Sequence, residues 1–198
     1  MSFSPEAILD VLDRHQVHYV LVGGYAATLH GARRPTTDVD ITPEMSRANL
    51  DRLAAALKEL QARVRVDDVP EGLPFGADAT SLAGLLFANL TTPHGDLDLT
   101  FTPSGTGGYA ELIVSAQRTR VGSVDVDVAS LGDIIRSKRA AGRPKDADAL
   151  PELARLQRAL TGRAPGAEAL RDAARQIPSP SRSVGQGPTP PILERGLQ

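Results

Sequence analysis

The sequence contains no cysteine. This absence excludes disulfide bonds, thiolate catalysis and zinc sites built on cysteine. No apolar run approaches the roughly 20 residues that span a membrane, and residues 1–5 lack a basic segment followed by a hydrophobic one. We therefore expect a soluble, cytoplasmic protein with no membrane partner.

A strong excess of either charge is also missing. The 22 lysines and arginines nearly balance the 24 aspartates and glutamates, which leaves a formal net charge of −2. No global basic field indicates a nucleic-acid partner, so that argument must rest on local charge. The length of 198 residues suits one well-cored domain and is short for two.

Hydrophobic periodicity predicts an α/β fold. Strands are expected at 17–22, 39–41, 87–92, 97–101 and 124–128, and helices at 25–29, 109–116, 131–139 and 146–160. Further helix starts are expected at Ser4-Pro5 and at Thr42-Pro43, the second opening a long helix, whereas residues 67–80 are expected to be irregular.

A change in composition divides the chain near residue 162. Residues 1–162 are expected to form the domain, and residues 163–176 a helical extension. Proline, serine and glycine dominate residues 177–198. Such a segment cannot bury enough surface to offset its ordering entropy, so we expect it to be disordered.

The pattern richest in chemistry combines two glycines with two aspartates. An apolar run ends in Gly23 and Gly24, and Asp38 and Asp40 alternate along a later apolar strand. Strand residues two apart point to the same face, so the two carboxylates lie side by side and repel unless a cation lies between them. Oxygen ligands suit Mg²⁺ or Mn²⁺. A glycine turn that opens a helix lets backbone N–H groups approach a phosphate, so the pattern indicates metal-dependent chemistry on a nucleoside triphosphate.

These residues resemble the minimal nucleotidyltransferases of the DNA polymerase β superfamily, whose signature is an apolar strand, Gly-Gly or Gly-Ser, and then Asp-x-Asp. The longer form of the pattern resembles the AbiEii/MenT branch of toxin nucleotidyltransferases, since it also holds Ala26, His30, Gly31, Arg34 and Thr36. The resemblance implies the minimal nucleotidyltransferase fold, a short mixed sheet backed by helices with a helical C-terminal portion.

The resemblance also implies which carboxylates hold metal ions. Asp38 and Asp40 would be the shared ligands of a two-metal site. The superfamily usually adds a third carboxylate from a neighbouring strand. Asp96 and Asp98 are two candidates on one strand face, and we prefer Asp98 because it lies deeper in the strand and matches the family's Gly-x-x-Asp position. Asp125 and Asp127 alternate in the same way in a later strand, so Asp127 is an alternative third ligand.

Lys138 occupies an unusual position in a late helix. Leu131, Ile134 and Ile135 form an apolar stripe whose next step lands on Lys138. A lysine there either snorkels at the edge of the core or points into a cleft. In the resembled family a lysine of this helix serves the active site, on the triphosphate or near the hydroxyl.

Helical periodicity also distinguishes Asp146 from Asp148. Asp146 shares a helix face with Leu150 and Leu153 and should look inward, whereas Asp148 lies on the solvated face. Asp146 is therefore a catalytic candidate, either to orient Lys138 or Lys145 or to act as a base.

Arg34 and Thr36 precede the aspartates and should lie at the mouth of the cleft. With Gly23 and Gly24 they are our nucleotide-binding candidates, since an arginine there can hold phosphate oxygens bidentately. Between residues 133 and 163, eight basic side chains face four acidic ones, a local excess that suits an RNA phosphate backbone.

We therefore expect a nucleotidyltransferase that moves a nucleoside monophosphate from an NTP to a hydroxyl. The toxin resemblance implies the 3′ end of tRNA as acceptor, and a cognate antitoxin as partner. Two alternatives stay open: transfer to a small molecule such as an aminoglycoside or to a protein hydroxyl, and a non-catalytic NTP-binding module.

Overall fold

The computed structural model describes residues 3–74 and 76–162. The chain divides into two units, Met1–Leu160 and Thr161–Gln198, and the second is described only at residues 161 and 162. The helical extension expected at 163–176 and the disordered tail expected at 177–198 lie outside the described residues. In the part of the chain that is described, no helix is both long and apolar enough to cross a membrane.

A mixed eight-stranded sheet in the order β4-β3-β5-β6-β2-β1-β8-β7 forms the centre of the first unit. The strands are β1 (Tyr19–Val22), β2 (Asp38–Pro43), β3 (Arg63–Val66), β4 (Val69–Pro74), β5 (Phe87–Thr92), β6 (Gly95–Thr100), β7 (Gln117–Val121) and β8 (Val124–Val128). Strand β1 runs parallel to β8, and β2 runs parallel to β6, while the other neighbours are antiparallel. The predicted α/β class with a mixed sheet is confirmed.

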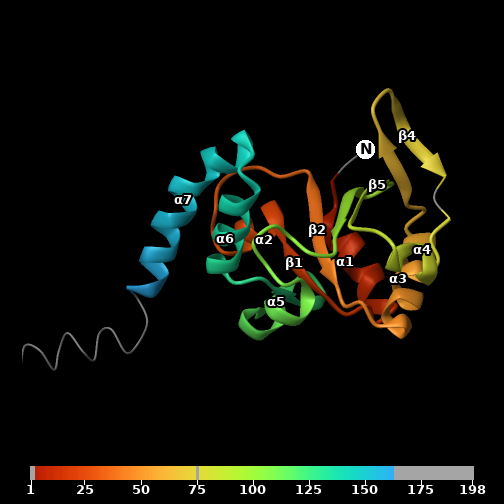
Figure 1. The fold of residues 1–198 in the computed structure, drawn as a ribbon, viewed down its shortest axis with the longest axis horizontal. Coiled ribbons are helices and arrows are strands. Elements are labelled where there is room, and N and C mark those ends of the chain that lie inside the picture. The colour runs from red at the N-terminus through yellow and green to blue at the C-terminus, as the bar shows by residue number, and fades with distance from the viewer. Residues whose placement is uncertain (1–2, 75, 163–198) are drawn as a thin grey trace, which may run out of the picture. The chain divides into compact units, whose positions relative to one another are not determined.

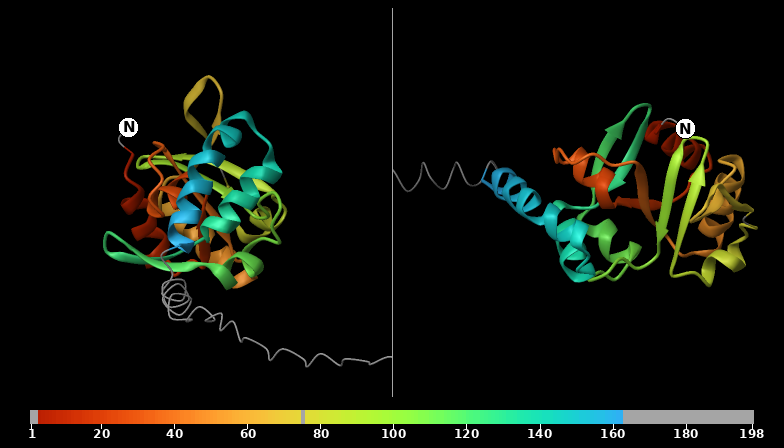
Figure 2. Two further views of the ribbon diagram at one scale, coloured as in Figure 1. Left: turned by 90° about the vertical axis from the view of Figure 1, so that its left-hand side faces the viewer. Right: turned by 90° about the horizontal axis from the view of Figure 1, so that it is seen from above.

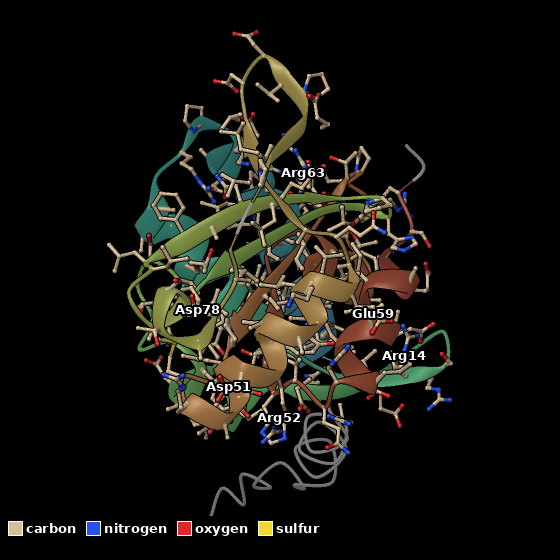
Figure 3. The ribbon with its side chains drawn as sticks, turned by 90° about the vertical axis from the view of Figure 1, so that its right-hand side faces the viewer. Arg14, Asp51, Arg52, Glu59, Arg63 and Asp78 are labelled. Atoms are coloured by element: carbon tan, nitrogen blue, oxygen red, sulfur yellow. The ribbon has the colours of Figure 1, made fainter. Side chains whose placement is uncertain are left out.

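Helices flank this sheet (Figure 1). They are α1 (Pro5–Arg14), α2 (Gly23–Leu29), α3 (Arg47–Glu59), α4 (Ala79–Ala83), α5 (Tyr109–Ser115), α6 (Leu131–Ala141) and α7 (Pro144–Thr161). The blue α7 and the teal α6 lie side by side near α2, and the yellow β3–β4 hairpin lies at the other end of the sheet (Figures 1 and 2). Helix α1 packs against α3, where Arg14 and Glu59 form an ion pair (Figure 3).

The register of the central strands separates carboxylates from the core. Asp38 pairs with Asp96, and Asp40 pairs with Asp98, across the parallel strands β2 and β6. The residues that alternate with them are apolar and fully buried, namely Val39, Ile41, Leu97 and Leu99. Since side chains alternate along a strand, one face of these strands faces the core and the other carries the acidic groups. The predicted alternation along both strands is confirmed.

The prediction that Thr42-Pro43 starts a helix is wrong. Strand β2 continues through Pro43, with Thr42 fully buried opposite Val20 of β1. Helix α3 begins four residues later, and Ser46 caps it by accepting a hydrogen bond from the Asn49 N–H at 3.3 Å. A serine whose hydroxyl can accept the N–H three residues on is the better cap, and the buried strand overrides the local signal of the proline.

The prediction that residues 67–80 are irregular is also wrong. Strand β4 covers Val69–Pro74 and pairs with β3 as a hairpin, and α4 starts directly after Asp78. The Asp78 carboxylate accepts the backbone N–H groups of Thr80 and Ser81. Glycine and proline within β4 conceal the strand in the sequence, and both are tolerated because β4 is an edge strand.

Candidate active site

The two glycines let the backbone lie directly against the acidic strand. Gly23 has a φ of +69°, and a Cβ built on it would lie 1.9 Å from Asp40 Oδ2. A Cβ on Gly24 would lie 2.7 Å from Thr36 Oγ1. The Gly24 N–H donates to Asp40 Oδ2 at 3.3 Å. Only glycine fits this approach and this backbone angle. Helix α2 begins at Gly23, two residues before the predicted start at Tyr25.

Three carboxylates gather beside this turn. Asp38, Asp40 and Asp98 can each offer one oxygen, and these atoms all lie within 4.8 Å of one another. The parallel register of β2 and β6 brings Asp98 next to Asp40. Thr36 fixes Asp38 by donating its hydroxyl to Oδ1 at 2.5 Å. The donor set is made only of carboxylate oxygens, which fits Mg²⁺ or Mn²⁺ rather than zinc.

The electrostatics of this cluster favour a bound cation. Burial, followed by the charges of Asp38 and Asp98, raises the pKa of Asp40 to about 7, although the Gly24 N–H and Lys138 act in the opposite direction. Burial also raises the pKa of Asp98, against the opposing effect of Arg65. A divalent cation among the three oxygens would compensate both the burial and the mutual repulsion. The residues present therefore fit the metal that the sequence implied.

A buried ion pair fixes Lys138 near the carboxylates. Lys138 Nζ donates to Asp146 Oδ1 at 2.8 Å, and Arg143 Nε donates to Asp146 Oδ2 at 2.6 Å. The Asp146 side chain is fully buried and that of Lys138 is 17% exposed. Burial opposes the charge of Asp146, but the hydrogen bonds from Lys138 and Arg143 outweigh it and lower the pKa of this carboxyl. The prediction that Asp146 faces inward is confirmed, and its partner is Lys138.

The local sequence explains how this pair forms. Ser130 caps α6 by accepting the Asp133 N–H at 3.2 Å. Gly142, with a φ of +62°, ends α6 in the left-handed conformation, and Pro144 opens α7. This short turn brings Asp146 of α7 back to Lys138 of α6.

Two cavities meet at the centre of the site. Their volumes are about 490 and 370 Å³, and both are lined by Gly23, Asp40, Asp98, Lys138 and Arg143. The smaller cavity also contains the predicted nucleotide-binding candidates, Gly24, Arg34 and Thr36, together with Asp38, Lys145 and Asp146. The larger one adds Leu86, Phe87, Asn89 and several hydroxyl groups. The arrangement offers space for two substrates with the carboxylates and one lysine between them.

The alternative third ligand lies elsewhere. Asp127 accepts a hydrogen bond from Arg118 at 2.8 Å and lines a separate cavity of about 420 Å³ with Tyr19 and Tyr109. Asp125 pairs with Arg120 at 3.3 Å on the same hairpin. The fold brings Asp98, and not Asp127, to the two aspartates of β2.

Sequence reasoning missed Arg65, which contacts both acidic side chains of β6, Asp96 and Asp98. It also missed Phe87 as a cavity residue and Arg143 as a partner of Asp146. The alternation Arg63-Val64-Arg65-Val66 has the period of a strand and was a usable signal for β3. The contact of Arg65 with β6 depends on strand order, which no local sequence pattern reveals.

Comparison with known proteins shows the fold. No protein-family model matches the sequence, and no curated protein matches it significantly. The lincosamide antibiotic adenylyltransferase LnuA, solved with bound lincomycin, is 16% identical with a TM-score of 0.50, and the match covers 79% of this chain and 99% of LnuA. The solution structure of the antibiotic-resistance factor ANT(2'')-Ia is 20% identical with a TM-score of 0.49, over 86% of this chain and 89% of that one.

The likeness to LnuA confirms the predicted nucleotidyltransferase fold. Because the two sequences are only 16% identical, the likeness shows the fold and nothing further. The toxin branch, the metal ligands and the roles of the site residues stay predictions.

Proposed function

We propose that this chain is a metal-dependent nucleotidyltransferase that moves a nucleoside monophosphate from an NTP to a hydroxyl and releases pyrophosphate. The observation that carries the proposal is the meeting of three carboxylates, from β2 and β6, with Lys138 from α6 where two cavities join. Asp38, Asp40 and Asp98 would hold Mg²⁺ or Mn²⁺. The ion would supply positive charge to the reacting phosphate and activate the hydroxyl.

The smaller cavity suits the triphosphate. Arg34 and Lys145 line it with exposed cationic groups that suit phosphate oxygens, and Gly23 and Gly24 line it at the start of α2. Lys138 lines both cavities and would balance the charge that develops on the leaving pyrophosphate. Asp146 positions Lys138 and keeps it from turning into solvent, because it is itself buried and held by Arg143.

The larger cavity suits the acceptor, which we propose to be the 3′ end of tRNA. Leu86 and Phe87 are 79% and 62% exposed there. A terminal base can stack on such an aromatic side chain. Exposed basic residues lie on α6, on α7 and in the turn between them and suit an RNA backbone, namely Arg139, Arg143, Lys145, Arg155 and Arg158. Of these, Arg143 and Lys145 line the cavities. A toxin role and a cognate antitoxin follow from the resemblance of the motifs, not from these contacts.

A small-molecule hydroxyl is the second candidate acceptor. The larger cavity, of about 490 Å³, lies within the range of roughly 300–1,000 Å³ that holds small ligands. LnuA, which shares the fold, was solved with lincomycin.

The test is transfer of label from each NTP, with Mg²⁺, to total tRNA or to lincosamide and aminoglycoside acceptors. We expect labelled tRNA, with a label that disappears in Asp40→Ala. Label on a small molecule and not on tRNA would mean that the acceptor is a small-molecule hydroxyl. NTP binding without transfer to any acceptor, protein hydroxyls included, would overturn the proposal in favour of a non-catalytic module.

Phe87→Ala tests the assignment of the two cavities. It should raise KM for the acceptor about tenfold, equivalent to the roughly 1–3 kcal/mol of one stacked base, and leave KM for the NTP unchanged. Val114→Ala is the matched control, since Val114 is 84% exposed on α5 and lies outside the lining of both cavities. A rise in KM for the NTP alone would mean that the larger cavity binds the nucleotide and not the acceptor.

A further inference from the structure

A fixed positive charge lies on the acidic face of the sheet. Strand β3 pairs with β5 so that Val64 faces Leu90, and β5 pairs with β6 so that Asn89 faces Asp98. Continuing this register brings Arg65 level with Asn89, next to Asp98 and then Asp40. The side chain of Arg65 therefore reaches across β5 to the carboxylates of β6.

Arg65 holds both carboxylates of β6. Its Nη1 lies 2.5 Å from Asp96 Oδ2, and its Nη2 donates to Asp98 Oδ1 at 2.9 Å and to Asp98 Oδ2 at 3.0 Å. Because one nitrogen contacts both oxygens of Asp98, the guanidinium occupies the edge of the carboxylate that a cation would share. Asp98 is also one of the three carboxylates that can each offer an oxygen to a metal ion, with Asp38 and Asp40.

Two cations would therefore depend on one carboxylate. A guanidinium keeps its charge at any ordinary pH, so Arg65 cannot leave this contact by losing a proton. A divalent cation bound to Asp98 would meet the positive charge of Arg65 at the same carboxylate, and the two repel. We propose that Arg65 competes with the divalent cation for Asp98 and weakens the metal site in the absence of nucleotide.

The competition has a consequence for the order of binding. Asp38 and Asp40 hold the cation weakly on their own while Arg65 keeps Asp98. Phosphate oxygens of a bound NTP then add negative charge and ligands at the same place, so tight metal binding awaits the nucleotide. This last step rests on the proposed function, whereas the competition for Asp98 does not.

Arg63 provides a matched control on the same strand. It is two residues from Arg65, and its guanidinium donates to the Gly72 carbonyl at 2.9 and 3.2 Å rather than to a carboxylate. Figure 3 labels Arg63 near the start of the β3–β4 hairpin. Arg63→Gln removes a charge and hydrogen bonds from β3 but leaves Asp98 with its partner.

The experiment measures Mn²⁺ affinity of the full chain by calorimetry, without NTP or acceptor. Arg65→Gln should lower the Kd for Mn²⁺ on the order of tenfold, because a unit charge close to the metal is removed. Arg63→Gln should change it less than about twofold, and Arg65→Lys, which keeps the charge, should stay close to the wild type. A purely structural role of Arg65 would loosen the hairpin and could not tighten metal binding.

A double-mutant cycle tests whether the effect runs through Asp98. In an Asp98→Asn background, Arg65→Gln should no longer improve Mn²⁺ binding. An unchanged or weaker affinity in Arg65→Gln, or a gain that persists in the Asp98→Asn background, overturns the proposal. If Arg65→Gln does not fold, the cycle is run with Arg65→Lys against Arg65→Met, and the same gain is expected from Arg65→Met. Since no turnover is measured, a chain without transferase activity would defeat the proposed function and leave this result intact.

Discussion

Strands β6 and β8 carry the same pattern and have different chemistry. Each alternates two aspartates with buried apolar residues, Asp96 and Asp98 in one and Asp125 and Asp127 in the other. Strand β6 lies next to β2, so Asp98 joins two further carboxylates. Strand β8 is separated from β2 by β1 and pairs with the edge strand β7, where arginines neutralise both aspartates.

The difference teaches that alternation defines a strand face and strand order defines its chemistry. An isolated acidic pair opposite arginines forms two exposed ion pairs, which contribute little to stability. The same pair beside a second acidic strand forms a site that attracts a cation. Four predictions break or sharpen this contrast.

The largest effect is expected for the carboxylates themselves. Asp40→Ala should lower kcat/KM for nucleotidyl transfer by about 1,000-fold or more, because several kcal/mol of metal-dependent stabilisation are lost. Asp127→Ala should change it less than about twofold. The measurement is steady-state transfer with each purified variant. Equal losses in the two variants would mean that β8, too, belongs to the site.

The next largest effect is expected for Lys138. Lys138→Ala should lower kcat about 100-fold, the size typical for removal of one group that stabilises developing charge. Arg139→Ala, the next residue and exposed on α6, lines neither cavity and should leave kcat within about twofold. A rise in KM with an unchanged kcat for Lys138→Ala would mean that Lys138 binds the substrate and does not stabilise developing charge.

Asp40 should also limit the stability of the metal-free protein. Its pKa rises from 3.8 to about 7 on folding, so the folded state binds the proton more tightly and the free energy of unfolding falls as pH increases from about 4 to 7. Asp40→Asn removes this penalty and should stabilise the metal-free chain at pH 8 by up to about 4 kcal/mol. Asp127→Asn should lower stability by less than about 1 kcal/mol, since it breaks an exposed pair.

Urea unfolding at pH 4, 6 and 8 in the presence of a chelator measures this difference. Adding Mg²⁺ should raise the stability of the wild type and leave that of Asp40→Asn nearly unchanged. A stability difference between wild type and Asp40→Asn that does not vary with pH would contradict the assignment.

The smallest effect in the series concerns two glycines with positive φ. Gly23→Ala adds a Cβ that overlaps Asp40, so it should lower stability by about 2–3 kcal/mol and transfer at least tenfold. Gly122, between β7 and β8, has a φ of +55° with its nearest neighbour, Glu6 Cγ, at 3.3 Å. Gly122→Ala should cost only the backbone strain of about 1–2 kcal/mol and leave transfer unchanged. Thermal unfolding and the transfer assay separate the two.

Much of the site could be predicted because its signals are local. Gly23-Gly24 and Asp38-x-Asp40 lie within a short strand–turn–helix–strand segment, and period-two alternation places both carboxylates on one face. The stripe through Leu131 that ends on Lys138, and the inward face of Asp146, follow from helical period in the same way. These patterns depend on residues within a few turns of each other in the chain.

The parts that were missed depend on strand order and on the geometry of a turn. Arg65 meets Asp98 only because β3 and β6 both pair with β5, and Arg143 meets Asp146 only because the turn after α6 brings the two together. Local signals also failed where tertiary burial outweighs them, as at Thr42 and Pro43 in β2.

The sequence by itself determined the α/β class, the glycine turn, the acidic strand faces and the helix faces that carry Lys138 and Asp146, because these follow from local periodicity. The tertiary structure alone decided whether Asp98 or Asp127 joins Asp38 and Asp40, paired Asp146 with Lys138, and placed Arg65 against Asp98. The physical reason is that strand order sets which charges become neighbours, and the energy of a charge depends on its neighbours and its burial far more than on its place in the chain.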